Sequence, residues 1–128
     1  MSGSDHFADG RSRYFAAKAR AARSRDFWRE SLNIVDDHRP ASSLAWGWCG
    51  KARRERIANI ALSEWKLLCP KLSELPADLS PGDFRQALTA NVRRRIQQEK
   101  VGFVWWLPIL YAVAEVIIRL LIERWLAR

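Results

Sequence analysis

Cysteine and histidine are scarce in this sequence. Its two cysteines, Cys49 and Cys69, stand twenty positions apart, no CxxC pair occurs, and there are two histidines. Structural zinc sites need clusters of these residue types, and disulfide-stabilised domains need several cysteine pairs. The composition therefore excludes a dense zinc framework and argues against a disulfide scaffold. It favours reduced thiols and a cytosolic setting for the first part of the chain.

The N-terminal segment lacks the apolar core of a secretory signal peptide, because MSGSDHFADG is mostly polar. The next segment, RSRYFAAKARAARSR, has the arginine and alanine content of an organellar presequence. Such presequences are poor in acidic residues, whereas Asp5 and Asp9 stand directly before this one. We therefore expect no cleaved targeting segment.

Motifs of catalytic chemistry are missing as well. WGWCGK ends in Gly-Lys like a phosphate-binding loop, but Ala45 and Ala52 replace its first glycine and its Ser/Thr. The acidic pair and histidine at 36–38 stand at a predicted helix end, where polar residues are usual. Cys49 has no histidine at a spacing that indicates a nucleophile pair. We expect no catalytic residue, no cofactor, no metal site and no enzymatic activity.

Positive charge is abundant, and most of it precedes the final apolar segment. Residues 1–100 hold 19 Lys and Arg against 12 Asp and Glu, and residues 101–128 hold 3 against 2. A basic first part predicts a polyanionic partner, which is either nucleic acid or the anionic face of a membrane.

The first predicted helix is the candidate contact to nucleic acid. Its arginines are placed to follow phosphates, and Trp28 to stack on a base. The alternative is a solvated basic helix with Trp28 in the core, and no DNA- or RNA-recognition motif accompanies the patch. The arginines are Arg20, Arg23, Arg25 and Arg29.

Helical periodicity without strand-like alternation predicts an all-α chain of about three short amphipathic helices and one long C-terminal hydrophobic helix. The first helix is expected at about 12–35, the second at 51–68 after a loop at 41–50, and the third from Pro81. In the third, apolar residues recur every four positions: Phe84, Leu88, Val92 and Ile96. By segment, we expect a disordered tail (1–11), a basic two-helix region (12–69), a proline-rich connector (70–80), a basic amphipathic helix (81–100) and a hydrophobic transmembrane or interfacial helix (101–125).

The last segment, VGFVWWLPILYAVAEVIIRLLIERW, is apolar around most of a helical wheel. Residues 101–122 form a helix of about 33 Å, against a hydrocarbon core of about 30 Å. We therefore predict a single-pass membrane anchor, kinked at Pro108, with residues 1–100 on the cytosolic side.

Three sets of site residues follow from this model. Trp105, Trp106, Trp125, Arg124 and Arg128 are predicted to lie at the membrane interfaces. A stripe roughly 80° wide is predicted to face a partner within the membrane: Pro108, Ala112, Glu115, Arg119 and Glu123. A patch for anionic lipid or another polyanion is predicted at Arg93, Arg94, Arg95 and Lys100.

The favoured hypothesis is a membrane-anchored, non-catalytic adaptor, scaffold or assembly factor with a protein partner or a second copy at the stripe. One alternative is a soluble, oligomeric nucleic-acid-binding protein whose tail is buried in the oligomer. Another is a pore-forming or membrane-permeabilising protein.

Overall fold

The computed structural model describes residues 26–40, 44–69, 81–101 and 104–126. Every regular element in these ranges is helical, so the all-α prediction is confirmed for this part of the chain. The predicted tail at 1–11, the connector at 70–80 and the first half of the first helix lie outside it. The elements are α2 (Phe27–Asp37), α3 (Leu44–Cys49), α4 (Lys51–Leu68), α5 (Pro81–Gln98), the 3-10 helix η2 (Val104–Trp106) and α6 (Leu107–Trp125).

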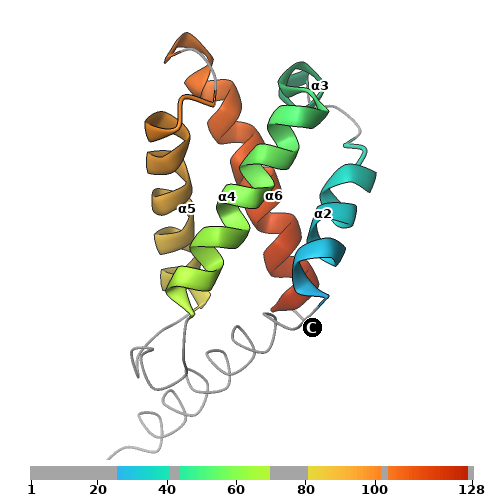
Figure 1. The fold of residues 1–128 in the computed structure, drawn as a ribbon, viewed down its shortest axis with the longest axis vertical. Helices are drawn as coiled ribbons and strands as arrows, with labels where there is room; N and C mark the ends of the chain where they lie inside the picture. The colour runs from blue at the N-terminus through green and yellow to red at the C-terminus, as the bar shows by residue number, and fades with distance from the viewer. Residues whose placement is uncertain (1–25, 41–43, 70–80, 102–103, 127–128) are drawn as a thin grey trace, which may run out of the picture.

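The helices form a bundle in which α4 lies across α6, with α5 on one side and α2 on the other (Figure 1). The short helices α3 and η2 stand at the same end of the bundle, together with the first turn of α4 and the last turn of α5. We call this the upper end, because it is at the top of Figure 1. The opposite end carries the last turns of α4 and α6.

Helix α4 is the centre of the bundle, because it packs against α2, α5 and α6. Its buried residues cover a wide arc that runs from Ile57 to Trp65. Trp65 is fully buried, and its ring lies 5.4 Å from that of Phe27 and 5.0 Å from that of Phe84. These aromatic contacts join α2, α4 and α5 in one core.

Helix α5 buries the predicted four-residue repeat, and it ends in a motif that needs a left-handed residue. Lys100 has φ +50°, its N–H donates to the carbonyl of Gln97, and the N–H of Val101 donates to that of Ile96. This pair of hydrogen bonds is a Schellman motif, and the buried side chains of Val101 and Ile96 supply its hydrophobic contact. Glycine is the usual residue at the left-handed position, so the lysine there is strained.

This strain predicts a difference between two variants that both remove the lysine charge. We expect the free energy of unfolding of Lys100→Gly to be about 1 kcal/mol higher than that of Lys100→Ala, since only glycine adopts this backbone conformation without cost. Urea denaturation followed by circular dichroism measures the difference. Equal stability of the two variants would show that Lys100 carries no backbone strain.

Helix α6 corrects the predicted membrane anchor. Its apolar arc is covered by α2, α3, α4 and α5, and it contributes six buried residues to the core. Among the described residues, no helix combines the length and the apolar character that a membrane crossing needs. The predicted single-pass topology, with its cytosolic orientation, is therefore wrong. The buried residues of α6 are Leu110, Val113, Ala114, Ile117, Ile118 and Leu121.

Two local predictions are also wrong. The segment predicted as a loop at 41–50 contains α3, which buries Trp46 and Cys49. Arg54 holds this short helix on α4, because its guanidinium donates to the Trp46 carbonyl at 2.7 Å and lies over the indole at 5.2 Å. Pro108 stands in the first turn of α6, where no intrahelical N–H bond is lost, and it starts the helix instead of kinking it.

Candidate functional site

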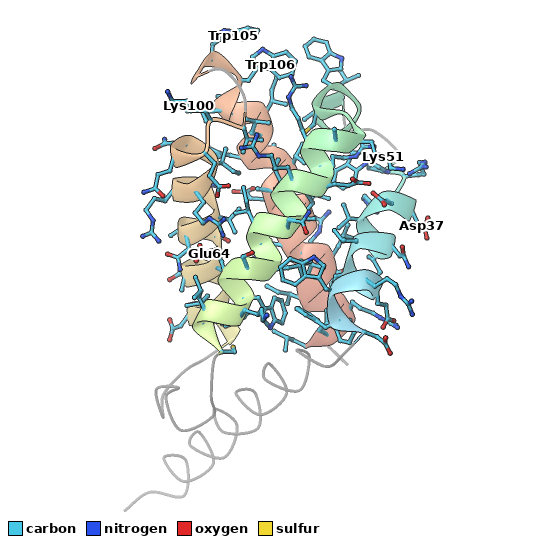
Figure 2. All side chains as sticks on the ribbon, viewed as in Figure 1. Asp37, Lys51, Glu64, Lys100, Trp105 and Trp106 are labelled. Carbon is cyan, nitrogen blue, oxygen red and sulfur yellow. The ribbon has the colours of Figure 1, made fainter. Side chains whose placement is uncertain are left out.

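The predicted patch of basic residues at the end of α5 is divided among different surroundings. Arg93 pairs with Glu115 of α6, and its guanidinium lies 5.2 Å from the Tyr111 ring. Arg95 points to the opposite side, toward Glu64 of α4. Arg94 is exposed, and Lys100 lies at the upper end (Figure 2). Since successive helical residues differ by 100°, this run of arginines forms no single patch.

The predicted partner stripe is the exposed face of α6. All five of its residues are exposed: Pro108, Ala112, Glu115, Arg119 and Glu123. Glu115 and Arg119 stand four positions apart, a spacing that suits an ion pair, but Glu115 pairs with Arg93 of α5. The narrow polar stripe of α6 therefore faces solvent, and the four helices α2, α3, α4 and α5 cover the rest of its surface.

The residues predicted for the membrane interfaces separate into two groups. At one end of α6, the indole N–H of Trp125 donates to Ser31 Oγ at 3.0 Å, and Arg124 pairs with Glu30. Both contacts fasten α6 to α2. At the other end, Trp105 and Trp106 form a tilted ring pair at 5.2 Å. Arg128 lies outside the described residues.

The upper end combines exposed indoles with positive charge. Trp48 of α3 is 63% exposed and Trp105 of η2 is 70% exposed, although most large apolar side chains in the described part of the chain are covered. Figure 2 shows Trp105, Trp106 and Lys100 at this end. Arg53 connects α3, α4 and η2, because its guanidinium donates to the Cys49 carbonyl at 3.4 Å and lies 5.4 Å from the Trp106 ring.

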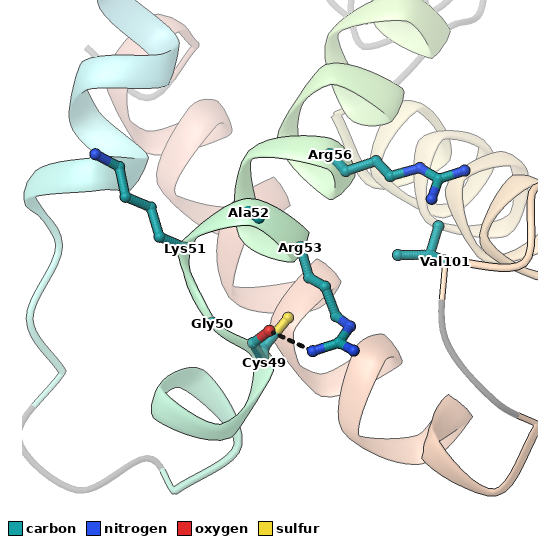
Figure 3. A pocket seen from close by; sticks show the side chains of 7 residues that line it. All are labelled: Cys49, Gly50, Lys51, Ala52, Arg53, Arg56 and Val101. Atoms are coloured by element: carbon teal, nitrogen blue, oxygen red, sulfur yellow. Dashed lines mark hydrogen bonds between the residues drawn. The ribbon is translucent and has the colours of Figure 1, made fainter.

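A pocket of about 510 Å³ opens at the upper end, between the first turn of α4 and Val101, three residues beyond the end of α5. Figure 3 shows the guanidiniums of Arg53 and Arg56 on the same side of α4, with Arg56 extended toward Val101. Arg56 is held there by a hydrogen bond from its Nη2 to the Glu99 carbonyl at 2.8 Å. The Lys51 side chain extends away from both arginines (Figure 3). The lining residues are Cys49, Gly50, Lys51, Ala52, Arg53, Arg56 and Val101.

The backbone of α4 adds to the positive potential of this pocket. Gly50 precedes the helix with φ +82°, and no side chain caps the first turn. The first N–H with a helical acceptor is that of Arg54, which donates to the Gly50 carbonyl at 3.0 Å. The preceding N–H groups, at 51–53, have no acceptor within the helix, and the helix dipole places its positive end here. The site therefore suits an anion.

The Cys49 thiol belongs to the floor of the pocket and not to its chemistry. Burial raises the pKa of this thiol, and the opposing charges of Arg54 and Arg53 only partly offset the effect. The thiol is therefore protonated at neutral pH and is a poor nucleophile. The described residues also contain no group of three His, Cys, Asp or Glu that could hold a metal ion.

Sequence reasoning missed this site because its residues come from three segments with different predicted roles. Trp48 was placed in a loop and Trp105 in a membrane interface, while Arg53 and Arg56 belong to the second predicted helix, to which no site was assigned. The run WGWCGKARRER did carry a signal, since it joins two tryptophans to a cluster of cations. No family model, no curated protein and no solved structure matches the chain.

Proposed function

We propose that the protein is a non-catalytic module that binds single-stranded nucleic acid at the upper end of its bundle. One observation carries the proposal, namely that α3 and η2, which carry the exposed Trp48 and Trp105, lie at the same end of the bundle as Arg53 and Arg56 in the first turns of α4. Proteins that bind single strands combine a positive surface for the backbone with aromatic rings on which bases stack. The two indoles supply the rings, and the arginines supply the positive surface.

The choice of basic residue supports the same ligand. The chain contains 17 arginines and 5 lysines among its 22 basic residues. Arginine presents a planar fork of donors that matches phosphate oxygens in pairs, and it stacks on aromatic planes. An excess of arginine is therefore suited to phosphates and bases together, whereas a surface that only needs charge is served equally well by lysine.

An anionic membrane surface also attracts tryptophan and cations, but the fold offers less for it. Helices that lie in a membrane interface present a long apolar face to the lipid. The long apolar face of α6 is used in the core, and α3, which carries Trp48, has six residues. The upper end therefore favours separate stacking contacts over insertion of a helix face.

The test is a titration of the protein into a fluorescently labelled single-stranded oligonucleotide, followed by anisotropy. We expect binding that weakens with salt, with a slope of log K against log salt of about −2 if three phosphates are contacted. Trp48→Ala and Trp105→Ala should each weaken binding by about 1–3 kcal/mol, which is roughly 5-fold to 150-fold, because each removes one stacking platform.

Leu67→Ala provides the matched control, since Leu67 is an exposed apolar residue on the last turn of α4, at the opposite end of the bundle. The affinity of Leu67→Ala for the oligonucleotide should equal that of the unaltered protein. Vesicles with anionic lipid form a second arm of the experiment. Binding to vesicles without binding to the oligonucleotide would refute the proposal, as would tryptophan variants that bind normally.

A further inference from the structure

We propose that the pocket at the first turn of α4 is a subsite for a phosphomonoester, the terminal phosphate of a nucleic-acid strand. This inference rests on the proposed function, because it assigns one end of the same ligand to the pocket. The pocket adjoins both exposed indoles: Cys49 in its lining follows Trp48, and Arg53 in its lining lies over Trp106, which pairs with Trp105. The indoles and the pocket therefore lie at the same end of the bundle, and the proposal places the end of a stacked strand in the pocket.

The donors in the pocket suit phosphate oxygens. Among the described residues, Arg53 and Arg56 each donate one hydrogen bond, to the carbonyls of Cys49 and Glu99. A guanidinium has five N–H donors, so each retains several for a ligand while its backbone contact fixes its position. The two groups come from the same face of α4, one turn apart, and both are exposed to solvent.

The charge of the pocket distinguishes a terminal phosphate from an internal one. Two guanidiniums and the positive end of the α4 dipole add to a charge of about +2.5. A phosphomonoester carries about −1.5 to −2 at neutral pH, whereas an internal phosphodiester carries −1. A monoester also has a single ester substituent, so it enters a pocket end-on without passing a chain through it. The pocket is thus better matched to a strand end.

Lys100 adds a positive charge at the upper end, next to the pocket in sequence. It precedes Val101, which lines the pocket, and it occupies the left-handed position that closes α5. Residues held in sparsely populated backbone conformations occur at functional sites more often than elsewhere. A charged residue at a position suited to glycine is consistent with use of its ammonium group in ligand binding.

The experiment compares two 12-nucleotide single strands of one sequence, one with a 5′-phosphate and one with a 5′-hydroxyl. At 0.1 M salt we expect the phosphorylated strand to bind about tenfold more tightly. Arg53→Gln and Arg56→Gln should each reduce this ratio toward one. Arg85→Gln, an exposed arginine near the start of α5, is the matched control and should retain the full ratio. Inorganic phosphate should compete with the phosphorylated strand and not with the other.

The outcomes separate this inference from the proposed function. Equal affinity for the strands with a 5′-phosphate, with a 3′-phosphate and with neither, with the dependence on Trp48 and Trp105 intact, refutes the phosphate subsite and leaves nucleic-acid binding in place. The absence of binding to either strand refutes both. A tenfold preference that Arg53→Gln and Arg56→Gln leave unchanged places the terminal phosphate elsewhere and overturns the assignment. A third strand, with a 3′-phosphate and a 5′-hydroxyl, tests the other end, and a preference for it that Arg53→Gln and Arg56→Gln abolish also supports the subsite.

Discussion

Trp65→Ala is expected to lower the free energy of unfolding by about 3–5 kcal/mol, the largest effect of any single substitution considered for this bundle. The indole is fully buried on α4 and contacts the rings of Phe27 and Phe84. Its removal leaves a cavity between three helices, and the rings of Phe27 and Phe84 lose their contacts with the indole as well. Since small domains are stable by about 5–15 kcal/mol, the variant should be close to unfolding at 37 °C. Urea denaturation monitored by far-UV circular dichroism measures the change.

Trp105→Ala is the matched control, because it makes the same substitution at an indole that is 70% exposed. Its free energy of unfolding should change by no more than about 0.5 kcal/mol. The comparison separates the two roles of tryptophan in this chain, since Trp65 serves the core and Trp105 is assigned to ligand binding. A loss below 1 kcal/mol for Trp65→Ala would contradict the central position of α4.

The helices that were predicted correctly have apolar residues at regular helical spacing in the sequence. The second predicted helix coincides with α4, and the third differs from α5 by two residues at its end. In α5 the repeat from Phe84 to Ile96 leaves one way to bury apolar side chains, on a single narrow face. A regular stripe of this kind fixes both the helix and the face it buries.

The prediction for α6 failed because hydropathy indicates that most of the helix surface is buried but does not indicate whether lipid or protein buries it. A helix that is apolar nearly all round is buried either in lipid or in the centre of a protein. The choice between the two depends on partners on other helices: Glu115 pairs with Arg93 of α5, and Trp125 donates a hydrogen bond to Ser31 of α2. Those partners are 22 and 94 positions away in sequence, so no local window contains them.

The candidate site was beyond sequence reasoning for a related reason. Tryptophan is usually a core residue, and the sequence does not distinguish Trp48 and Trp105 from Trp46 and Trp65. Only the packed bundle shows that the first two are exposed and the other two buried. The Gly and Ser content at 41–50 indicated a loop, but the contact between Arg54 and Trp46 stabilises a short helix there. In both cases tertiary contacts overrode the local signal.

The second large effect is expected at the ion pair between Glu64 and Arg95. Glu64 is 3% exposed, and its carboxylate has Arg95 Nη1 at 3.4 Å, while Arg95 Nε also contacts Glu99 at 2.7 Å. Arg95→Leu should lower the free energy of unfolding by about 2–4 kcal/mol, because it leaves the buried carboxylate without its counter-charge. The value is below that of a fully buried pair, since the Arg95 side chain is 28% exposed and water reaches it. Urea denaturation of the single variant provides the measurement.

The double variant Glu64→Leu/Arg95→Leu isolates the cause. If the cost comes from an unpaired buried charge, removal of both partners should recover most of the lost stability, because leucines at the α4–α5 contact need no solvation. Arg94→Leu, one residue away and exposed, should change stability by no more than about 0.5 kcal/mol. A double variant as unstable as Arg95→Leu would mean that Arg95 acts through Glu99 or through its own packing. Such a result would assign the arginine to the end of α5 and not to the carboxylate of Glu64.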